Sequence, residues 1–233
     1  MNTAIANEDG STRLNHLRCL FFCSGMAMLL YADSKFTSPY VMSVFVALTE
    51  KKLPFKIHTV DLDAGANNDP DYASISLTQR VPTLIDSNFA LSESSAIVEY
   101  LDEAFPDPRM FPSDRQQRAR ARQVQAWLRS DFLPIRVERP TPTIFCQQPA
   151  TTPLSAAAQA ASRKLCAGAS ELLSHGGDNL CGDWSIADVD LALMLNRLIM
   201  NGDQVPLPLV RYAGAQWERP SVQDWVRRER PPQ

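Results

Sequence analysis

The spacing of apolar residues divides the chain into two parts of different character. In the first part, short apolar runs of strand length alternate with longer runs of helical spacing. Strands are predicted at residues 28–32, 55–62, 81–86 and 89–92, and helices at 38–53 and 93–104. The polar segment at residues 63–79 is compatible with one more short helix. The predicted order is therefore β-α-β-α-β-β-α.

A proline-rich segment ends the first part and opens a second part that is helical throughout. Three prolines fall between Phe105 and Asp114, and they stop the preceding helix. Beyond them, helices are predicted at residues 115–132, 155–173, 185–200 and 221–229. Ser185 and Asp188 have the spacing of a capping box at the start of the third of these helices. The pattern therefore joins an α/β unit to an all-helical unit.

The division of the chain follows from these patterns. We expect an N-terminal extension at residues 1–27, an α/β domain at 28–107, a linker at 108–114 and an all-helical domain at 115–233. The extension contains the apolar run "LRCLFFCSGMAMLL" after basic residues, which resembles a secretory signal. Glu8 and Asp9 dilute that basic character, and the last residues of the run belong to the first predicted strand. Both facts argue against a secretory signal. We expect a disordered extension or a true start at Met26 or Met28, and export is the alternative.

Composition and charge narrow the classes of function. With 45% apolar and 21% charged residues, the chain has the mixture that is typical of soluble globular proteins. Its formal net charge of -3 argues against a nucleic-acid-binding protein, which normally has a basic surface. The histidines and the five cysteines show neither metal-ligand nor disulfide spacing. We therefore expect a cytoplasmic protein with reduced thiols, without a bound metal, a nucleic-acid partner or a membrane association.

Polar residues gather where two of the predicted helices begin. Ser38 suits an N-cap, and Pro39 suits the first helical position, where a missing N–H has no cost. Glu93 and Ser94 stand where free backbone N–H groups attract an anion, although capping by a neighbouring serine is the alternative. Pro82 opens a strand, which fits either a trans proline at a sheet edge or a cis bond.

These motifs, in this order, resemble those of the glutathione transferases. They read "VP" at residues 81–82, "LSESSAIVEYL" at 91–101 and "SIAD" at 185–188, and the likeness extends over about residues 28–228. The segments "SPYVMSVFVAL" and "ADVDLALMLNRL" are most similar to the YfcF-type bacterial members. The resemblance implies a thioredoxin-like domain followed by an all-α domain, glutathione as co-substrate, and a homodimer.

The resemblance also implies how glutathione is held. Pro82 would follow a cis peptide bond, and the backbone of Val81 would pair with the cysteinyl part of glutathione. Ser94 would bind the γ-glutamyl carboxylate and Glu93 the γ-glutamyl ammonium group. Arg80 would face the glycyl carboxylate, because a guanidinium fork suits a carboxylate. A solvated surface arginine is the alternative for Arg80.

Ser38 is the candidate catalytic residue, because "SPY" resembles the "SPF" of transferases that use serine. A hydroxyl at a helix N-terminus would stabilise the glutathione thiolate, which is the nucleophilic form, without a covalent bond to the protein. Ser34, Thr37 and Tyr31 are the rivals, and a simple N-cap is the alternative role of Ser38.

The residue type at position 38 limits the chemistry. Omega-type relatives have a cysteine there, and Ser38 excludes a mixed disulfide with glutathione at that position. The resemblance therefore implies conjugation of glutathione to an electrophile or glutathione-dependent reduction of a hydroperoxide. The alternative is a non-catalytic binding or interaction protein with the same fold.

The second substrate is expected between the two domains, against the helix at residues 115–132. Trp127, Phe132 and Arg136 are the candidates for its binding site. Several arginines of the same helix are predicted to form a solvated charged face: Arg115, Arg118, Arg120, Arg122 and Arg129.

Overall fold

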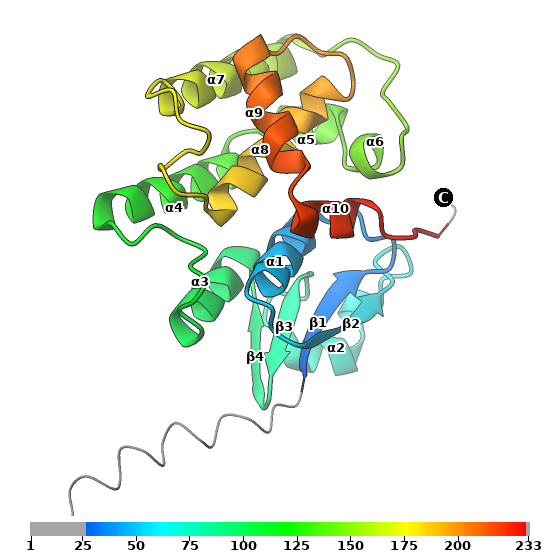
Figure 1. The fold of residues 1–233 in the computed structure, drawn as a ribbon. Coiled ribbons are helices and arrows are strands. Elements are labelled where there is room, and N and C mark those ends of the chain that lie inside the picture. Colours follow the sequence, from blue (N-terminus) through cyan, green and yellow to red (C-terminus); the bar gives the residue numbers. More distant parts are fainter. Residues whose placement is uncertain (1–26, 232–233) are drawn as a thin grey trace, which may run out of the picture.

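The structure is a computed structural model that describes residues 27–231. Its first elements are β1 (Met28–Asp33), α1 (Pro39–Glu50), β2 (Phe55–Val60), the single 3-10 turn η1 (Ala66–Asn68), α2 (Pro70–Ile75), β3 (Thr83–Asp86), β4 (Phe89–Ser92) and α3 (Ser94–Ala104) (Figure 1). The predicted order β-α-β-α-β-β-α is confirmed, and α2 is the short helix expected in the polar segment. Of the predicted N-terminal extension at residues 1–27, residues 1–26 lie outside the described residues.

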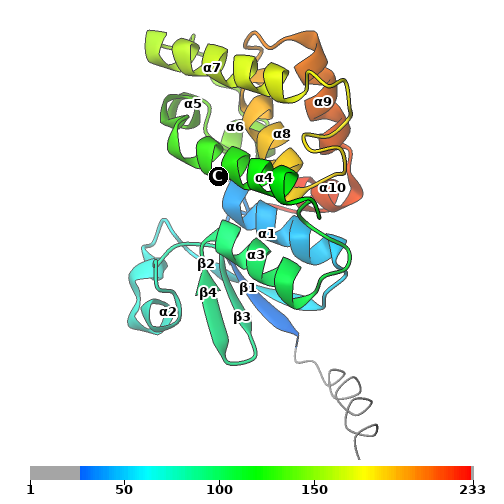
Figure 2. The ribbon, with the colours of Figure 1, turned by 90° about the vertical axis from the view of Figure 1, so that its left-hand side faces the viewer.

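The four strands form one mixed sheet in the order β2-β1-β3-β4. β1 runs parallel to β2 and antiparallel to β3, so that Leu30 lies opposite both Ile57 and Leu84. A parallel pair needs a crossover connection, which α1 provides. α1 and α3 lie side by side between the sheet and the helical part of the molecule, and α2 lies away from them (Figure 2).

α1 is buried around most of its circumference. The face predicted from helical spacing includes Val41 and Leu48, and both are buried. Every residue between them is buried as well, because α1 packs against α3 and also against α8 and α10 of the helical domain. The N-terminus of this central helix is held by Ser38 at the N-cap and Pro39 at the first helical position.

The rest of the described chain is helical. The elements are α4 (Arg115–Ser130), α5 (Leu133–Glu138), α6 (Pro142–Phe145), α7 (Ala156–Leu172), α8 (Ile186–Ile199), α9 (Leu207–Trp217) and α10 (Pro220–Val226). The four predicted helices are present, although the last begins at Pro220 and ends at Val226. α5, α6 and α9 were missed, because each has a proline in its first turn that looks like a break in the sequence.

A buried ion cluster joins α1, α3 and α4 beside the linker. The Asp102 carboxylate is 1% exposed and accepts hydrogen bonds from Lys51 Nζ (3.2 Å), the Met110 N–H (2.6 Å) and Arg118 Nη2 (2.5 Å). Lys51 also donates to the Phe105 carbonyl at 2.6 Å. The prediction of a solvated face on α4 is therefore wrong for Arg118, because its guanidinium pairs with a carboxylate inside the protein.

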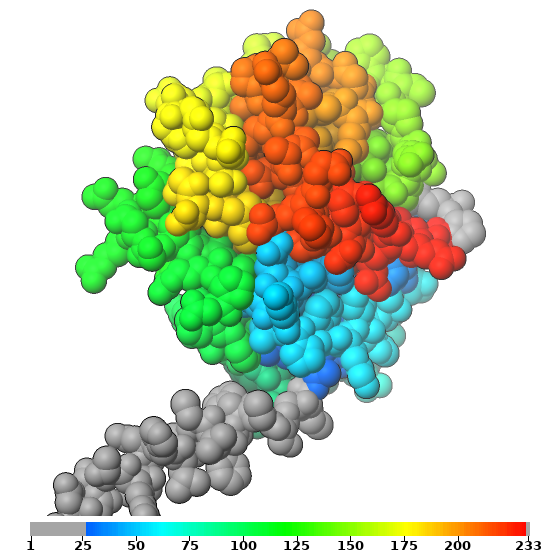
Figure 3. Space-filling view, viewed as in Figure 1, coloured from blue at the N-terminus to red at the C-terminus, as the bar shows by residue number. Residues whose placement is uncertain are grey.

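A second ion pair joins the end of α1 to the start of α10. Figure 3 shows the C-terminal segment, in red, lying directly on the N-terminal domain, in blue and cyan. There the Glu50 carboxylate at the end of α1 accepts hydrogen bonds from Arg219 Nε (2.7 Å), Arg219 Nη2 (3.0 Å) and the Ser221 hydroxyl. Burial alone would raise the pKa of Glu50, but the hydrogen bonds from Arg219 and Ser221 outweigh burial, and the pKa lies below its ordinary value.

This depressed pKa gives a pH-dependent contribution to stability. It is fully present above the unfolded-state pKa of Glu50, which is about 4.5, and it is lost as the pH falls through the lower folded-state pKa. We expect Glu50→Gln to reduce the free energy of unfolding by about 1 kcal/mol at pH 7, and by much less near pH 3. Urea titrations at the two pH values measure this difference. The exposed Glu171→Gln is the control, and an equal loss at both pH values contradicts the electrostatic origin.

Candidate active site

A cavity of about 230 Å³ opens between the loop before β3, the start of α3 and the helical domain. We call it the α3 cavity, and its lining residues are Tyr40, Thr78, Arg80, Val81, Pro82, Glu93, Ser94 and Arg129. The structure thus brings together around one space all five residues that were predicted to hold glutathione. Tyr40, Thr78 and Arg129 were not predicted for this role.

The loop before β3 is held by hydrogen bonds to its backbone. The Arg80 carbonyl accepts from the Tyr72 hydroxyl at 2.9 Å and from Thr83 Oγ1 at 3.2 Å. The Arg80 side chain is left exposed, and the Val81–Pro82 peptide bond that follows is cis, as the resemblance implied. The inward anchoring of the Arg80 carbonyl fixes the position of Val81 at the wall of the α3 cavity.

α3 begins without a capping side chain. Glu93 occupies the N-cap position with φ 77° and makes no side-chain cap hydrogen bond, so the alternative of capping by a neighbouring serine is wrong. A positive φ is unfavourable for a residue with a side chain, and such conformations persist where the surrounding structure enforces them. The Glu93 side chain is exposed, whereas Ser94 is buried. The first N–H groups of α3 therefore remain available for an anion.

Arg129 closes the α3 cavity from the helical domain. Its Nη2 lies 3.1 Å from Ser94 Oγ and 3.4 Å from the Asp190 carboxylate, and its guanidinium lies over the Tyr40 ring at 5.8 Å. The prediction of a solvated position is wrong for Arg129 as well. In the sequence, Arg129 lies at the border of the polar face of α4, and this position does not indicate that the N-terminal domain covers it.

Ser38 is not one of the residues that line the α3 cavity. Its Oγ accepts the Val41 N–H at 3.3 Å, which confirms the N-cap, and its own N–H donates to the buried Asp33 carboxylate at 3.1 Å. Asp33 also accepts hydrogen bonds from the N–H and the hydroxyl of Thr37. The hydroxyl of Thr37, a rival candidate to Ser38, therefore already has a partner. Ser38 stands two residues before Tyr40, which lines the α3 cavity, and its hydroxyl acts as an acceptor in the contact with Val41.

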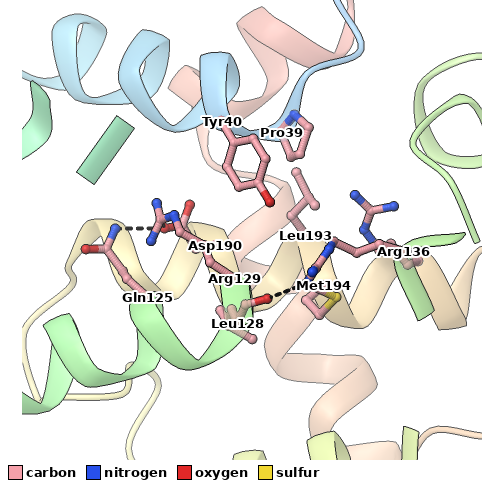
Figure 4. A pocket seen from close by; sticks show the side chains of 10 residues that line it. Pro39, Tyr40, Gln125, Leu128, Arg129, Arg136, Asp190, Leu193 and Met194 are labelled. Carbon is pink, nitrogen blue, oxygen red and sulfur yellow. Dashed lines mark hydrogen bonds and ion pairs between the residues drawn. The ribbon is translucent and has the colours of Figure 1, made fainter. Parts of the chain in front are cut away.

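A second, narrow cavity lies on the helical side of Tyr40. It measures about 30 Å³, and we call it the interdomain pocket. Its lining residues come from the start of α1 and from α4, α5 and α8: Pro39, Tyr40, Gln125, Leu128, Arg129, Arg136, Asp190, Leu193, Met194 and Arg197. Figure 4 shows the Tyr40 hydroxyl pointing from α1 toward α4 and α8. Tyr40 and Arg129 line both cavities, so the two cavities adjoin.

Of the three candidates for the second-substrate site, one lines the interdomain pocket and two do not. Arg136 lines the interdomain pocket. Trp127 and Phe132 do not, because their rings pack edge to face on each other at 4.7 Å and Phe132 is buried in the core. Helical spacing marks such aromatic residues as inward-facing, but it does not distinguish the core from the wall of a pocket.

Residues 27–231 contain no group of three or more His, Cys, Asp or Glu side chains arranged to hold a metal ion. In the same range, no helix combines the length and the apolar character needed to cross a membrane.

Comparison with known proteins identifies the family. The profile described as "Glutathione S-transferase, N-terminal domain" matches residues 37–104, and that described as "Glutathione S-transferase, C-terminal domain" matches residues 114–229. A crystal structure of a glutathione transferase homologue from Burkholderia (BGR1), with bound glutathione, is 46% identical with a TM-score of 0.71. The match covers 86% of this chain and 97% of that one. The chain belongs to the glutathione S-transferase family.

Curated relatives fit the same assignment. A maleylacetoacetate isomerase of Pseudomonas aeruginosa is 38% identical over 111 residues, which is 46% of this chain and 51% of that protein. The glutathione S-transferase theta-1 of Mus musculus is 33% identical over 103 residues, 44% of this chain and 42% of that protein. These matches span about half the length of either relative.

Proposed function

We propose that this protein is a glutathione S-transferase that binds glutathione in the α3 cavity and activates its thiol at Ser38. The observation that carries the proposal is the composition of the α3 cavity. A backbone wall at Val81, an uncapped helix start at Ser94 and two arginines surround this space, and Tyr40, two residues after a serine N-cap, lines it as well. Strand-like pairing, a helix N-terminus and guanidinium groups suit a tripeptide that has a carboxylate at each end.

Each part of glutathione has a proposed partner. The γ-glutamyl carboxylate binds at Ser94 and the first N–H groups of α3, and Glu93 takes the γ-glutamyl ammonium group. The Val81 backbone pairs with the cysteinyl residue beside the cis bond to Pro82. Arg80 binds the glycyl carboxylate. This orientation directs the cysteinyl thiol toward the start of α1.

The proposed reaction uses the bound thiolate as nucleophile. The Ser38 hydroxyl donates a hydrogen bond to the sulfur, and the thiol proton leaves to solvent. In conjugation, sulfur forms a bond to an electrophilic carbon, and the displaced group leaves with its electron pair. In the second reaction, two glutathione molecules reduce a hydroperoxide to an alcohol and water and become glutathione disulfide. The YfcF-type resemblance favours this second activity. The glutathione transferase family supports a homodimer, and the cysteine spacing favours a cytoplasmic protein.

The ionisation of bound glutathione tests the proposal. A free thiol has a pKa of about 8.5, and we expect binding to lower it by at least about one unit. Thiolate absorbance measured against pH, with and without protein, gives this pKa. Turnover of a chloronitrobenzene and consumption of a hydroperoxide then distinguish the two reactions. Glutathione that binds without a pKa shift supports the non-catalytic alternative, and absence of binding overturns the proposal.

The Arg129 side chain is expected to take part in glutathione binding. We expect its guanidinium to reach the γ-glutamyl carboxylate, because it lies 3.1 Å from Ser94 Oγ. Arg129→Met should then weaken glutathione binding roughly 10- to 100-fold, the effect of losing one hydrogen bond between charged groups. Titration calorimetry with glutathione and with γ-aminobutyryl-cysteinyl-glycine, which lacks that carboxylate, measures the effect.

The analogue separates a direct contact from a general disturbance of the site. Arg129→Met should change its affinity little, and Arg122→Met, which alters an arginine paired with Glu99, should affect neither ligand. A similar loss of affinity for glutathione and for the analogue contradicts the assigned contact.

A further inference from the structure

Two arginines of the interdomain pocket have no carboxylate partner among residues 27–231. Arg197, on α8, is only 3% exposed, and Arg136, on α5, is half-buried. Neither takes part in an ion pair in that range. Arg197 Nη1 donates to the Arg139 carbonyl at 2.6 Å and Arg136 Nη1 to the Leu128 carbonyl at 2.9 Å, while the buried Arg197 Nε has no hydrogen-bond partner.

The one acidic residue that lines the pocket does not neutralise these charges. The Asp190 carboxylate accepts from Gln125 Nε2 at 2.7 Å and pairs with Arg129 at 3.4 Å. Two guanidinium charges therefore remain uncompensated in a partly buried space. Burial lowers the pKa of Arg197 to about 10, so this guanidinium remains charged at pH 7.

Buried charges in proteins are normally paired, because removing an ion from water is costly. A guanidinium pair with free donors is suited to a carboxylate, which can accept hydrogen bonds from both. The volume of about 30 Å³ is the size of a small polar group rather than an aromatic ring. Apolar side chains of Pro39, Leu193 and Met194 form other parts of the wall.

We infer that the interdomain pocket receives a carboxylate of the second substrate, held by Arg136 and Arg197. The inference rests on the proposed transferase function. Because Tyr40 and Arg129 line both cavities, a substrate anchored by its carboxylate in the interdomain pocket can place its reactive carbon toward the α3 cavity. The preferred substrates are therefore electrophiles that carry a carboxylate.

A matched pair of electrophiles tests this inference: 4-chloro-3,5-dinitrobenzoate and its methyl ester. In each, the glutathione thiolate attacks the carbon that bears chlorine, a C–S bond forms, and chloride leaves with the C–Cl electron pair. Dividing kcat/KM by the uncatalysed rate with glutathione removes the difference in intrinsic reactivity. We expect the native protein to favour the acid by at least about tenfold, the effect of one hydrogen bond to a charged group.

Variants assign the preference to the two arginines. Arg136→Gln should lower the corrected kcat/KM for the acid about tenfold and change that for the ester less than about twofold. Arg197→Lys keeps the charge but loses the guanidinium fork. Like Arg136→Gln, it should lower the corrected kcat/KM for the acid and not that for the ester, but by a smaller factor. Arg115→Gln, an exposed arginine at the start of α4, is the matched control and should change neither rate.

Affinity for the finished conjugates gives a measurement that does not depend on turnover. We expect the protein to bind the carboxylate conjugate at least about tenfold more tightly than the ester conjugate, and Arg136→Gln to abolish the difference. If the ester is bound or turned over as well as the acid, or Arg136→Gln affects both equally, the inference is overturned while the transferase function stands. If neither glutathione nor either conjugate binds, the proposed function fails, and the inference fails with it.

Discussion

Ser38→Ala is expected to lower kcat/KM for glutathione conjugation roughly 10- to 100-fold and to raise the pKa of the bound thiol by about one to two units. The size follows from one hydrogen bond to a charged acceptor, which is worth about 1.5–3 kcal/mol. One pKa unit corresponds to about 1.4 kcal/mol, so the kinetic and ionisation effects should agree. Glutathione affinity at a pH below the thiol pKa should change little, because Ser38 is proposed to contact the sulfur and not the carboxylates.

The same substitution removes the N-cap of α1, and the two roles must be separated. Ser38 Oγ accepts the Val41 N–H, and losing such a cap costs about 0.5–2 kcal/mol of stability. Ser155→Ala removes a comparable cap, the 3.2 Å contact with the Ala158 N–H on α7, together with the hydrogen bond that the Ser155 hydroxyl donates to Glu138, and no residue of α7 lines either cavity. It should destabilise the protein to a similar extent and leave the thiol pKa unchanged.

A second variant keeps the cap and removes the donor. Ser38→Asp retains an oxygen that accepts from Val41 but provides a negative charge in place of a hydroxyl hydrogen. Stability should return toward the native value while the pKa of the bound thiol rises further than in Ser38→Ala. If both variants leave the thiol pKa at its native value, Ser38 acts only as a cap, and Ser34 and Tyr31 become the residues to test.

Local chemistry explains which features of the fold could be predicted. The start of α1 is specified by the adjacent pair Ser38 and Pro39, and the capping box of α8 by Ser185 and Asp188. Such motifs act within one helical turn, so the sequence contains the whole interaction. α5, α6 and α9 were missed because a proline in the first turn of a helix has the same appearance in sequence as a proline that ends one.

The residues of the site also fall into those that local sequence predicts and those that only the packing of distant segments brings in. The residues predicted around the α3 cavity lie in two short segments, 80–82 and 93–94, whose spacing can be compared with that of a family. Arg129 belongs to α4, and it meets Ser94 only because the helical domain packs over α3. Residues 35 positions apart that meet across a domain boundary leave no periodic signal in one sequence. The same holds for Arg136 and Arg197, which come together from α5 and α8.

Asp188→Ala is expected to have the largest effect on stability, a loss of about 4 kcal/mol in the free energy of unfolding. Asp188 is fully buried, and its carboxylate accepts hydrogen bonds from the Leu180 N–H (2.8 Å), the Ser185 N–H (2.9 Å), the Ser185 hydroxyl (3.0 Å) and the Tyr212 hydroxyl (2.9 Å). Alanine leaves two backbone N–H groups without this acceptor inside the protein. Folded proteins have free energies of unfolding of about 5–15 kcal/mol, so the expected loss is a large fraction of the total.

Two milder variants show whether the hydrogen bonds are the cause. Tyr212→Phe removes one of the four donors and should cost about 1 kcal/mol. Asp188→Asn keeps one acceptor oxygen but sets an amide N–H against the Ser185 donors, so its loss should fall between the other two. Urea unfolding followed by circular dichroism gives the three values. Equal losses for Asp188→Asn and Tyr212→Phe contradict a role for the contact with Ser185.

The pH dependence of the native protein provides an independent check on Asp188. Burial raises the pKa of its carboxyl, and the hydrogen bonds from Leu180, Ser185 and Tyr212 only partly oppose this. A folded-state pKa above the unfolded value means that the folded state binds the proton more tightly, so this group weakens folding as the pH rises through that interval. The loss caused by Asp188→Asn, which cannot ionise, should therefore be smaller at pH 7 than near pH 4. If the loss is larger at pH 7, the buried carboxylate stabilises the fold by its charge, and burial does not raise its pKa.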